Sequence, residues 1–98
     1  MNAFRFVWDI QKAKINFKKH GVTFEEAQTV FYDNNAQEFY DTAHSQLDED
    51  RFLILGISSI LRLLMICHCY RENDHEIRIF SARKATPAEA GFYKNRVK

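Results

Sequence analysis

The 98-residue sequence has few glycines and no long apolar run. Its three glycines, Gly21, Gly56 and Gly91, stand far apart, so no glycine-rich loop can cradle a phosphate with backbone amides. No apolar segment approaches the roughly 18 residues that a membrane-spanning helix needs. The N-terminus also lacks the basic-then-apolar order of a secretory signal. We therefore expect a cytoplasmic protein with no membrane association.

Cysteine is nearly absent, and the two present are Cys67 and Cys69. Two positions apart on a strand, their Cα atoms are about 6.6 to 6.8 Å apart, the far limit for a disulfide. We expect both to be reduced core residues. His68 between them must point to the other face of the strand, which excludes a Cys-His-Cys metal site. Neither a metal nor another cofactor is expected.

Basic residues are missing from the middle of the chain. Residues 21–50 contain eight acids and no lysine or arginine, whereas residues 1–20 carry a net charge of +4 and residues 51–98 one of +5. This segregation is compatible with a basic face for an anionic substrate and an acidic face for a basic partner. The alternative is that the charges intermix once the chain folds.

What the chain does have is aromatic and apolar bulk: nine Phe, four Tyr, one Trp, and 46% hydrophobic residues. We expect one domain spanning residues 1–98. Apolar periodicity predicts strands at 4–8, 36–41, 51–58 and 61–70 and from 76 onward, with helices at 9–19, 23–32 and 87–96. The fold class is therefore α+β, with a mainly antiparallel sheet, the order β-α-α-β-β-β-β-α, and helices mostly on one face.

Capping residues mark the helix ends. Asp9 can cap the first helix and Gly21 can end it in the left-handed conformation. Thr23-Phe24-Glu25-Glu26 and Thr86-Pro87-Ala88-Glu89 are capping boxes, the second with proline at the first helical position.

The segment 76–86 joins a strand to the last helix and carries three cations. Alternation in Ile77-Arg78-Ile79-Phe80 predicts that the isoleucines face the core while Arg78 and Phe80 face the other way. Arg83 and Lys84 are expected in the connection to the helix, next to its positive end. Cations beside a helix N-terminus favour phosphate binding.

Short motifs from Phe6 to Tyr93 resemble the BrnT toxin family in content and order. They are Trp8-Asp9, Lys12-Ala13, Asn16, Lys19-His20-Gly21-Val22, Phe24-Glu25-Glu26-Ala27, Val30-Phe31, Asp33, His44-Ser45, Glu49, Arg51-Phe52, Gly56-Ile57-Ser58, Arg62, His68, Ile77-Arg78-Ile79 and Ser81-Ala82-Arg83-Lys84-Ala85-Thr86. The resemblance implies a RelE-like ribonuclease fold, a type II toxin-antitoxin toxin, and RNA as substrate. It also implies inhibition by a BrnA-like antitoxin with a ribbon-helix-helix DNA-binding part. The toxin would then contact DNA only indirectly, through the antitoxin.

Metal-independent RNA cleavage needs proton-transfer groups and cations at the phosphate, because the 2′-hydroxyl of RNA is itself the nucleophile. His20 is the first candidate for proton transfer, since the C-terminal end of a helix stabilises imidazolium. Its alternative role is to cap that helix. Arg51, Arg78 and Arg83 are the candidates for binding phosphate.

Supporting contacts to the substrate are assigned to Lys19, Lys84 and Tyr93, each of which has a surface role as its alternative. His68 joins them if its strand face is the one that Arg78 occupies, and it is otherwise a packed histidine. Glu49 orients a histidine or acts as a base, and its alternatives are to pair with Arg51 or to remain solvated.

Two other functions remain open at this point. One is a binding module for RNA or an antitoxin, without catalysis. The other is a metal-dependent nuclease that uses the acidic segment 41–50, although this segment lacks the Asp-x-Asp-x-Asp-Gly order of a calcium loop.

Overall fold

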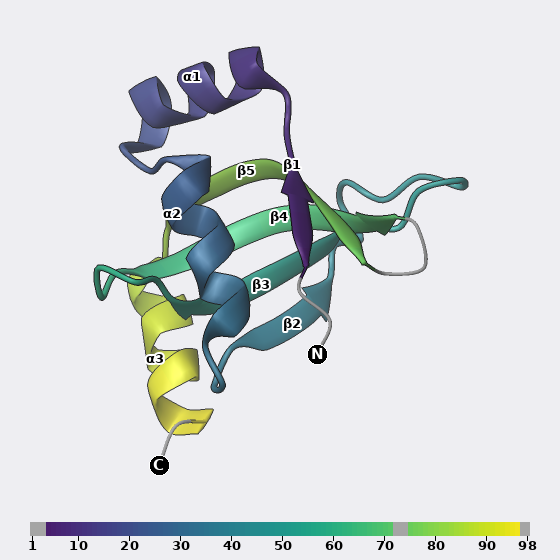
Figure 1. Ribbon diagram of the computed structural model, residues 1–98. Coiled ribbons are helices and arrows are strands. Elements are labelled where there is room, and N and C mark those ends of the chain that lie inside the picture. The colour runs from purple at the N-terminus through teal and green to yellow at the C-terminus, as the bar shows by residue number, and fades with distance from the viewer. Residues whose placement is uncertain (1–3, 72–74, 97–98) are drawn as a thin grey trace.

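A single five-stranded sheet organises the molecule (Figure 1). The computed structural model describes residues 4–71 and 75–96. The strands are β1 (Arg5–Val7), β2 (Gln37–Tyr40), β3 (Phe52–Ile57), β4 (Leu63–Arg71) and β5 (Glu76–Lys84), in the order β1-β5-β4-β3-β2. Strand β1 is parallel to β5 and the other pairings are antiparallel. The predicted α+β class and element order are confirmed.

The helices begin and end near the predicted residues. They are α1 (Ile10–His20), α2 (Phe24–Thr29) continued by a 3-10 turn (Val30–Tyr32), and α3 (Pro87–Arg96). The Asp9 side chain accepts from the Lys12 amide, and Gly21 has a φ of 69°, as a left-handed cap requires. In the described part of the chain, no helix is long and apolar enough to cross a membrane.

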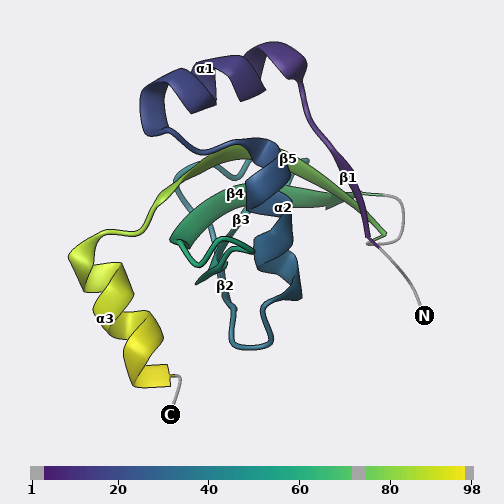
Figure 2. The same ribbon diagram turned by 60° about the vertical axis from the view of Figure 1, so that its left-hand side comes forward.

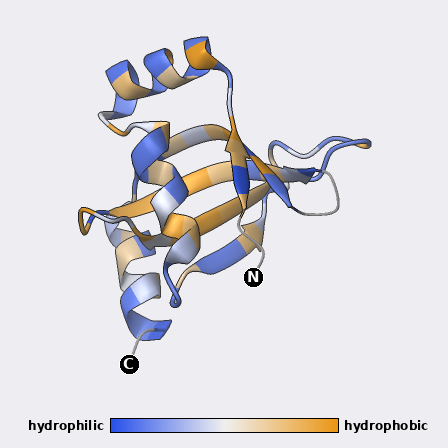
Figure 3. Ribbon diagram, viewed as in Figure 1, coloured by the Kyte–Doolittle hydropathy of each residue, from blue (hydrophilic) through white to orange (hydrophobic). Residues whose placement is uncertain are grey.

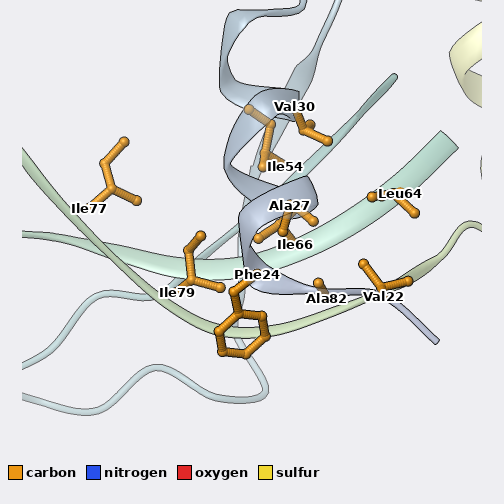
Figure 4. Packing of buried hydrophobic residues seen from close by; sticks show 10 residues of the cluster. All are labelled: Val22, Phe24, Ala27, Val30, Ile54, Leu64, Ile66, Ile77, Ile79 and Ala82. Carbon is orange, nitrogen blue, oxygen red and sulfur yellow. The ribbon is translucent and has the colours of Figure 1, made fainter. Parts of the chain in front are cut away.

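Helix α2 covers one face of the sheet, which we call the first face. The core there is formed by residues of α2, of the turns beside it and of the three longest strands (Figure 4): Val22, Phe24, Ala27, Val30, Ile54, Leu64, Ile66, Ile77, Ile79 and Ala82. Ile77 and Ile79 belong to this core, as the alternation along β5 predicted.

The opposite side of the sheet, the second face, is only partly covered by a helix. Helix α3 packs there through Tyr93 against Leu55 and Met65. In Figure 2, α2 and α3 stand apart with β3 and β4 between them. The expectation that the helices gather mostly on one face is therefore wrong, because α2 covers the first face, α3 packs on the second, and α1 lies along the edge of β5. Figure 3 shows that β3 and β4 are largely apolar.

Strand β5 is longer than predicted and carries a bulge. His68 pairs with Ile79 and Cys67 with Ser81, so Phe80 is the extra residue. The strand continues through Arg83 and Lys84, because their partners on β4 are Met65 and Leu64. Both cations were predicted to lie in the connection, and that placement is wrong. The predicted turn at 71–75 lies partly outside the described residues.

Gly56 allows the 3-10 turn to approach β3 closely. A Cβ atom at this position would lie 2.9 Å from Cγ1 of Val30 and 3.0 Å from Cβ of Ala36. Asp33 fastens the same junction, since its Oδ2 accepts from the Ile57 amide at 2.8 Å.

Candidate functional site

Cations gather around Phe80 on the second face of the sheet. The Arg51 guanidinium carbon lies 3.7 Å from the centroid of the Phe80 ring, and Nζ of Lys12 lies 5.5 Å from it. Arg51 reaches this place from the start of β3 and Lys12 from α1, while the bulge in β5 sets the position of Phe80. The negative π-face of the ring attracts both cations.

Glu49 fixes two of the neighbouring guanidinium groups. Its Oε1 accepts from Nε of Arg51 and its Oε2 accepts from Nη2 of Arg71, each at 2.8 Å. The predicted pairing of Glu49 with Arg51 is thus present. One carboxylate is shared between two arginines, so the cluster keeps a net positive charge.

His20 lies in a hollow of about 200 Å³ on the α1 side of Phe80. The hollow is lined by Lys12, Ile15, Asn16, Lys19, His20, Phe80 and Ser81. Phe80 is therefore common to this hollow and to the contact with Arg51. In this way the fold brings His20, Lys19 and Arg51 to two sides of a single ring.

Asn16 holds α1 in this position, against the part of β5 beyond its pairing with β1. Its side-chain amide donates to the Ala82 carbonyl at 2.9 Å and to the Val22 carbonyl at 3.0 Å, and its Oδ1 accepts from the Ala82 amide at 3.0 Å. Asn16 is the buried residue of α1, so these three bonds, rather than an apolar stripe, orient the helix.

Arg78 is half-buried on the second face, two residues before Phe80. Its strand neighbours are Cys69 on β4 and Val7 on β1. No carboxylate among residues 4–71 and 75–96 binds it. Within the described chain its guanidinium group is therefore available to an external anion.

Arg83 is engaged by a carboxylate of the protein itself. Its Nη1 and Nη2 donate to the two oxygens of Glu89 at 2.8 and 2.9 Å. This pair lowers the pKa of Glu89 to about 2 and raises that of Arg83. Glu89 also accepts from the Thr86 amide at 2.8 Å, so the start of α3 is capped internally. The pair joins β5 to α3 and does not reach the cations around Phe80.

His68 lies on the first face, away from Arg78, and direct contact with substrate is excluded. Its side chain is fully buried, with Nε2 2.9 Å from Oε2 of Glu38. The ring packs edge-on against Phe31, with centroids 4.7 Å apart. The sequence did not decide which face of the sheet His68 occupies. In the structure it is a packed, hydrogen-bonded histidine, which was the alternative to a substrate contact.

Tyr93 and Lys84 also lie apart from the cluster. Tyr93 is buried, and its hydroxyl donates to Oδ2 of Asp33 at 2.6 Å. Burial and Asp33 raise its pKa to about 12. Lys84 is exposed near Glu26, which holds Arg62 through a bidentate contact. The roles assigned to Tyr93 and Lys84 in substrate binding therefore have no geometric support.

Lys12, Phe80 and Arg71 were not among the predicted site residues. Lys12 is seven residues before Lys19, which places both on one stripe of a helix. Phe80 shares strand parity with Arg78, and this parity was visible in the sequence. No signal pointed to Arg71, because its role depends on the carboxylate of Glu49 from another strand connection.

A larger hollow of about 610 Å³ adjoins the cluster at the far end of β4. It is lined by Phe4, Asp48, Glu49, Asp50, Phe52, Cys69, Tyr70 and Arg71. Its charged lining consists of three carboxylates and Arg71, and it meets the cluster at Glu49, which binds both Arg51 and Arg71.

The cysteines are reduced and buried beneath this surface. Burial, aided by Asp41, raises the pKa of Cys67 to about 12, so its thiol is a poor nucleophile at neutral pH. In residues 4–71 and 75–96, no three His, Cys, Asp or Glu side chains are grouped to hold a metal ion.

Comparison with known proteins supplies a family and a structural neighbour. A family model described as "Ribonuclease toxin, BrnT, of type II toxin-antitoxin system" matches residues 8–89. The crystal structure of the Brucella abortus ribonuclease toxin BrnT superimposes with a TM-score of 0.66 and 21% sequence identity. The match covers 86% of this chain and 99% of that one. No curated protein matches the chain significantly.

Proposed function

Because the chain belongs to the BrnT family of ribonuclease toxins of type II toxin-antitoxin systems, we propose that it cleaves RNA beside Phe80 by metal-independent general acid-base chemistry. One observation carries this proposal: Phe80 lines the hollow of His20 and also stacks on Arg51. A proton-transfer group and a phosphate-binding group thus approach one point on the second face from opposite sides.

The cations bind the scissile phosphate and the one beside it. Arg51 and Arg78 supply guanidinium groups, which can bind two phosphate oxygens at once, and Lys12 supplies a point charge. Charge that develops on the phosphorane in the transition state is stabilised by these groups. Glu49 positions Arg51 and Arg71, and Arg71 contacts the flanking phosphate.

The 2′-oxygen bonds to phosphorus and gives its proton to a solvent water, while the bond from phosphorus to the 5′-oxygen breaks and His20 donates a proton to that leaving oxygen. His20 is the last residue of α1 and lines the hollow beside Phe80. Gly21, rather than His20, caps the helix by donating to the Phe17 carbonyl at 2.8 Å. No hydrogen bond occupies the His20 imidazole among the residues that the structure describes, so it is available to substrate.

The partner that silences the toxin is a protein, as the type II class implies. We propose a BrnA-like antitoxin with a ribbon-helix-helix part, so that contact with DNA is made by the antitoxin. The reaction takes place in the cytoplasm, where the RNA substrate and the antitoxin are made.

Cleavage of labelled RNA by antitoxin-free protein, with and without EDTA, tests the mechanism. We expect activity to survive EDTA and to fall at least tenfold in Arg51→Ala, Arg78→Ala and His20→Gln. A tenfold fall corresponds to about 1.4 kcal/mol of lost transition-state stabilisation. Arg83→Ala is the matched control, because its guanidinium is bound to Glu89 and should leave the rate within about twofold.

Loss of all activity with EDTA would assign the reaction to a metal, with the acidic segment 41–50 as the place to look. Equal activity in the three variants and the wild type would remove the Phe80 cluster from the mechanism. RNA binding without cleavage in any form would favour the binding-module alternative.

A further inference from the structure

The two flanks of α1 differ in chemistry. At 100° per residue, Lys12 and Lys19 lie on the flank that borders the His20 hollow. Ile10, Lys14 and Phe17 lie on the other flank, which borders a second groove. In Figure 3, α1 is apolar in its first turn and mostly hydrophilic beyond it.

The second groove is apolar and open. It has a volume of about 430 Å³ and runs between α1 and the start of α2, lined by Trp8, Ile10, Ala13, Lys14, Phe17, Thr23, Phe24 and Glu25. Ile10 is 68% exposed and Phe17 is 54% exposed. In Figure 1, α1 is the outermost element on its side of the sheet. Contiguous apolar surface of this kind marks a site for another molecule.

The charges beside the groove are arranged with one sign on each wall. Helix α1 carries four lysines and no acid, and Lys14 and Lys18 border the stripe of Ile10 and Phe17. The opposite wall carries Glu25, in the first turn of α2. A complementary occupant has apolar residues along its centre and carboxylates along the edge that meets α1.

We propose that this groove is the docking site for an acidic amphipathic helix of the antitoxin. The inference rests on the proposed function for the existence of that partner. An amphipathic helix presents apolar side chains at i, i+3, i+4 and i+7, which is the form that fits an elongated apolar groove. A helix in the groove lies about one helix diameter, roughly 10 to 12 Å, from the flank that borders the His20 hollow.

Other occupants fit the groove less well. RNA would bring phosphates and polar sugars against Ile10, Phe17 and Trp8. A second copy related by a two-fold axis along α1 would place Lys14 and Lys18 against their own equivalents, which is a repulsive arrangement.

Calorimetric binding of a BrnA-like antitoxin that inhibits this chain tests the proposal. Ile10→Asp and Phe17→Asp change exposed side chains, so both variants should fold normally. We expect each to weaken antitoxin binding at least tenfold, because an introduced carboxylate must be desolvated and faces an acidic partner. Leu47→Asp is the matched control, since Leu47 is fully exposed on the distant 41–50 segment, and its affinity should stay within twofold.

The sign of the charge effect gives a second readout. Lys14→Glu should weaken antitoxin binding about three- to tenfold, and more so at low salt, whereas Glu25→Gln should leave it equal or tighter. RNA cleavage by the free protein should be unchanged in all four groove variants. A wild type without ribonuclease activity would refute the proposed function while leaving the antitoxin affinities measurable.

Three results would overturn the inference. Normal antitoxin affinity in both aspartate variants would place the antitoxin elsewhere. A wild-type dimer in light scattering that dissociates in Phe17→Asp would assign the groove to a second copy. A fall in RNA affinity in Ile10→Asp and Phe17→Asp would assign it to the substrate.

Discussion

Phe80 illustrates how a single side chain can organise a charged surface. Its ring contacts Arg51 on one side and lines the hollow of Lys12, Lys19 and His20 on the other. Through this ring, Lys12 from the basic first 20 residues and Arg51 from the basic segment after residue 50 share a contact. The ring provides this point without adding a carboxylate that would neutralise the phosphate site.

Cys67 should be chemically inert in the folded protein. Its side chain is 7% exposed, and burial with help from Asp41 raises its pKa to about 12. We expect iodoacetamide at pH 8 to modify neither Cys67 nor the buried Cys69 in the native state and both in 8 M urea, as read by mass spectrometry. Rapid native labelling of Cys67 would show that the segment 41–50 opens away from β4.

The role of a residue could be predicted from the sequence where its neighbours within a few positions determine that role. Asp9, Gly21 and Thr23 act within three or four residues, and their capping roles were predicted and observed. The face that His68 occupies was not predictable, because strand parity pairs it with Ile66 but does not say which face α2 will cover. The ion pair of Arg83 was not predicted, because a capping-box glutamate, Glu89, binds two donors at once.

At the scale of elements, the junction between the 3-10 turn and β3 depends on the absence of a side chain at Gly56. We expect Gly56→Ala to lower the free energy of unfolding by about 1 to 3 kcal/mol, since its Cβ would overlap Val30 and Ala36. Urea denaturation measures this. Gly91→Ala is the control: its Cβ meets nothing within 4 Å inside α3, so it should stabilise by about 0.5 to 1 kcal/mol. Equal effects of the two would contradict the close approach.

The ion pair between β5 and α3 predicts a pH dependence. Glu89 has an ordinary pKa of 4.5, lowered to about 2 in the folded protein by Arg83, so the folded state favours its ionised form. Its contribution to stability is present above about pH 4.5 and is lost as the pH falls toward 2. Because Arg83 is partly exposed, we expect about 1 kcal/mol.

The measurement is the difference in unfolding free energy between the wild type and Glu89→Gln, taken at pH 7 and at pH 2.5. This difference should shrink with acidification. Glu25→Gln, which removes an exposed carboxylate from α2, controls for net charge. A difference that grows toward low pH would reverse the assigned sign.

Contacts between residues distant in the sequence determine where β5 and α2 end. Strand β5 continues to Lys84 because Leu64 and Met65 on β4 offer backbone partners there, although the residues themselves suggest a connection. Likewise α2 gives way to a 3-10 turn at Val30, where Asp33 and Gly56 draw the chain onto β3. Each boundary thus depends on residues more than 15 positions away, Leu64 and Met65 for the end of β5 and Gly56 for the end of α2.

At the scale of the whole molecule, Asn16 joins the first quarter of the chain to its last quarter. We expect Asn16→Ala to cost about 3 kcal/mol, since three hydrogen bonds are lost and the Ala82 amide and carbonyl are left without those partners. Hydrogen exchange should accelerate in α1 but not in α3, and RNA cleavage should fall with the displacement of Lys12 and His20. Unchanged exchange in α1 would show that apolar contacts suffice to hold it.

The parallel pairing of β1 with β5 has a consequence for synthesis. Arg5 is paired with Glu76, and α1 is held by Ala82, so neither can settle until most of the chain has left the ribosome. A nascent toxin would thus carry its histidine and lysines on an unanchored helix while it is still attached to a large body of RNA. The proposed ribonuclease site can therefore form only after Ala82 has emerged.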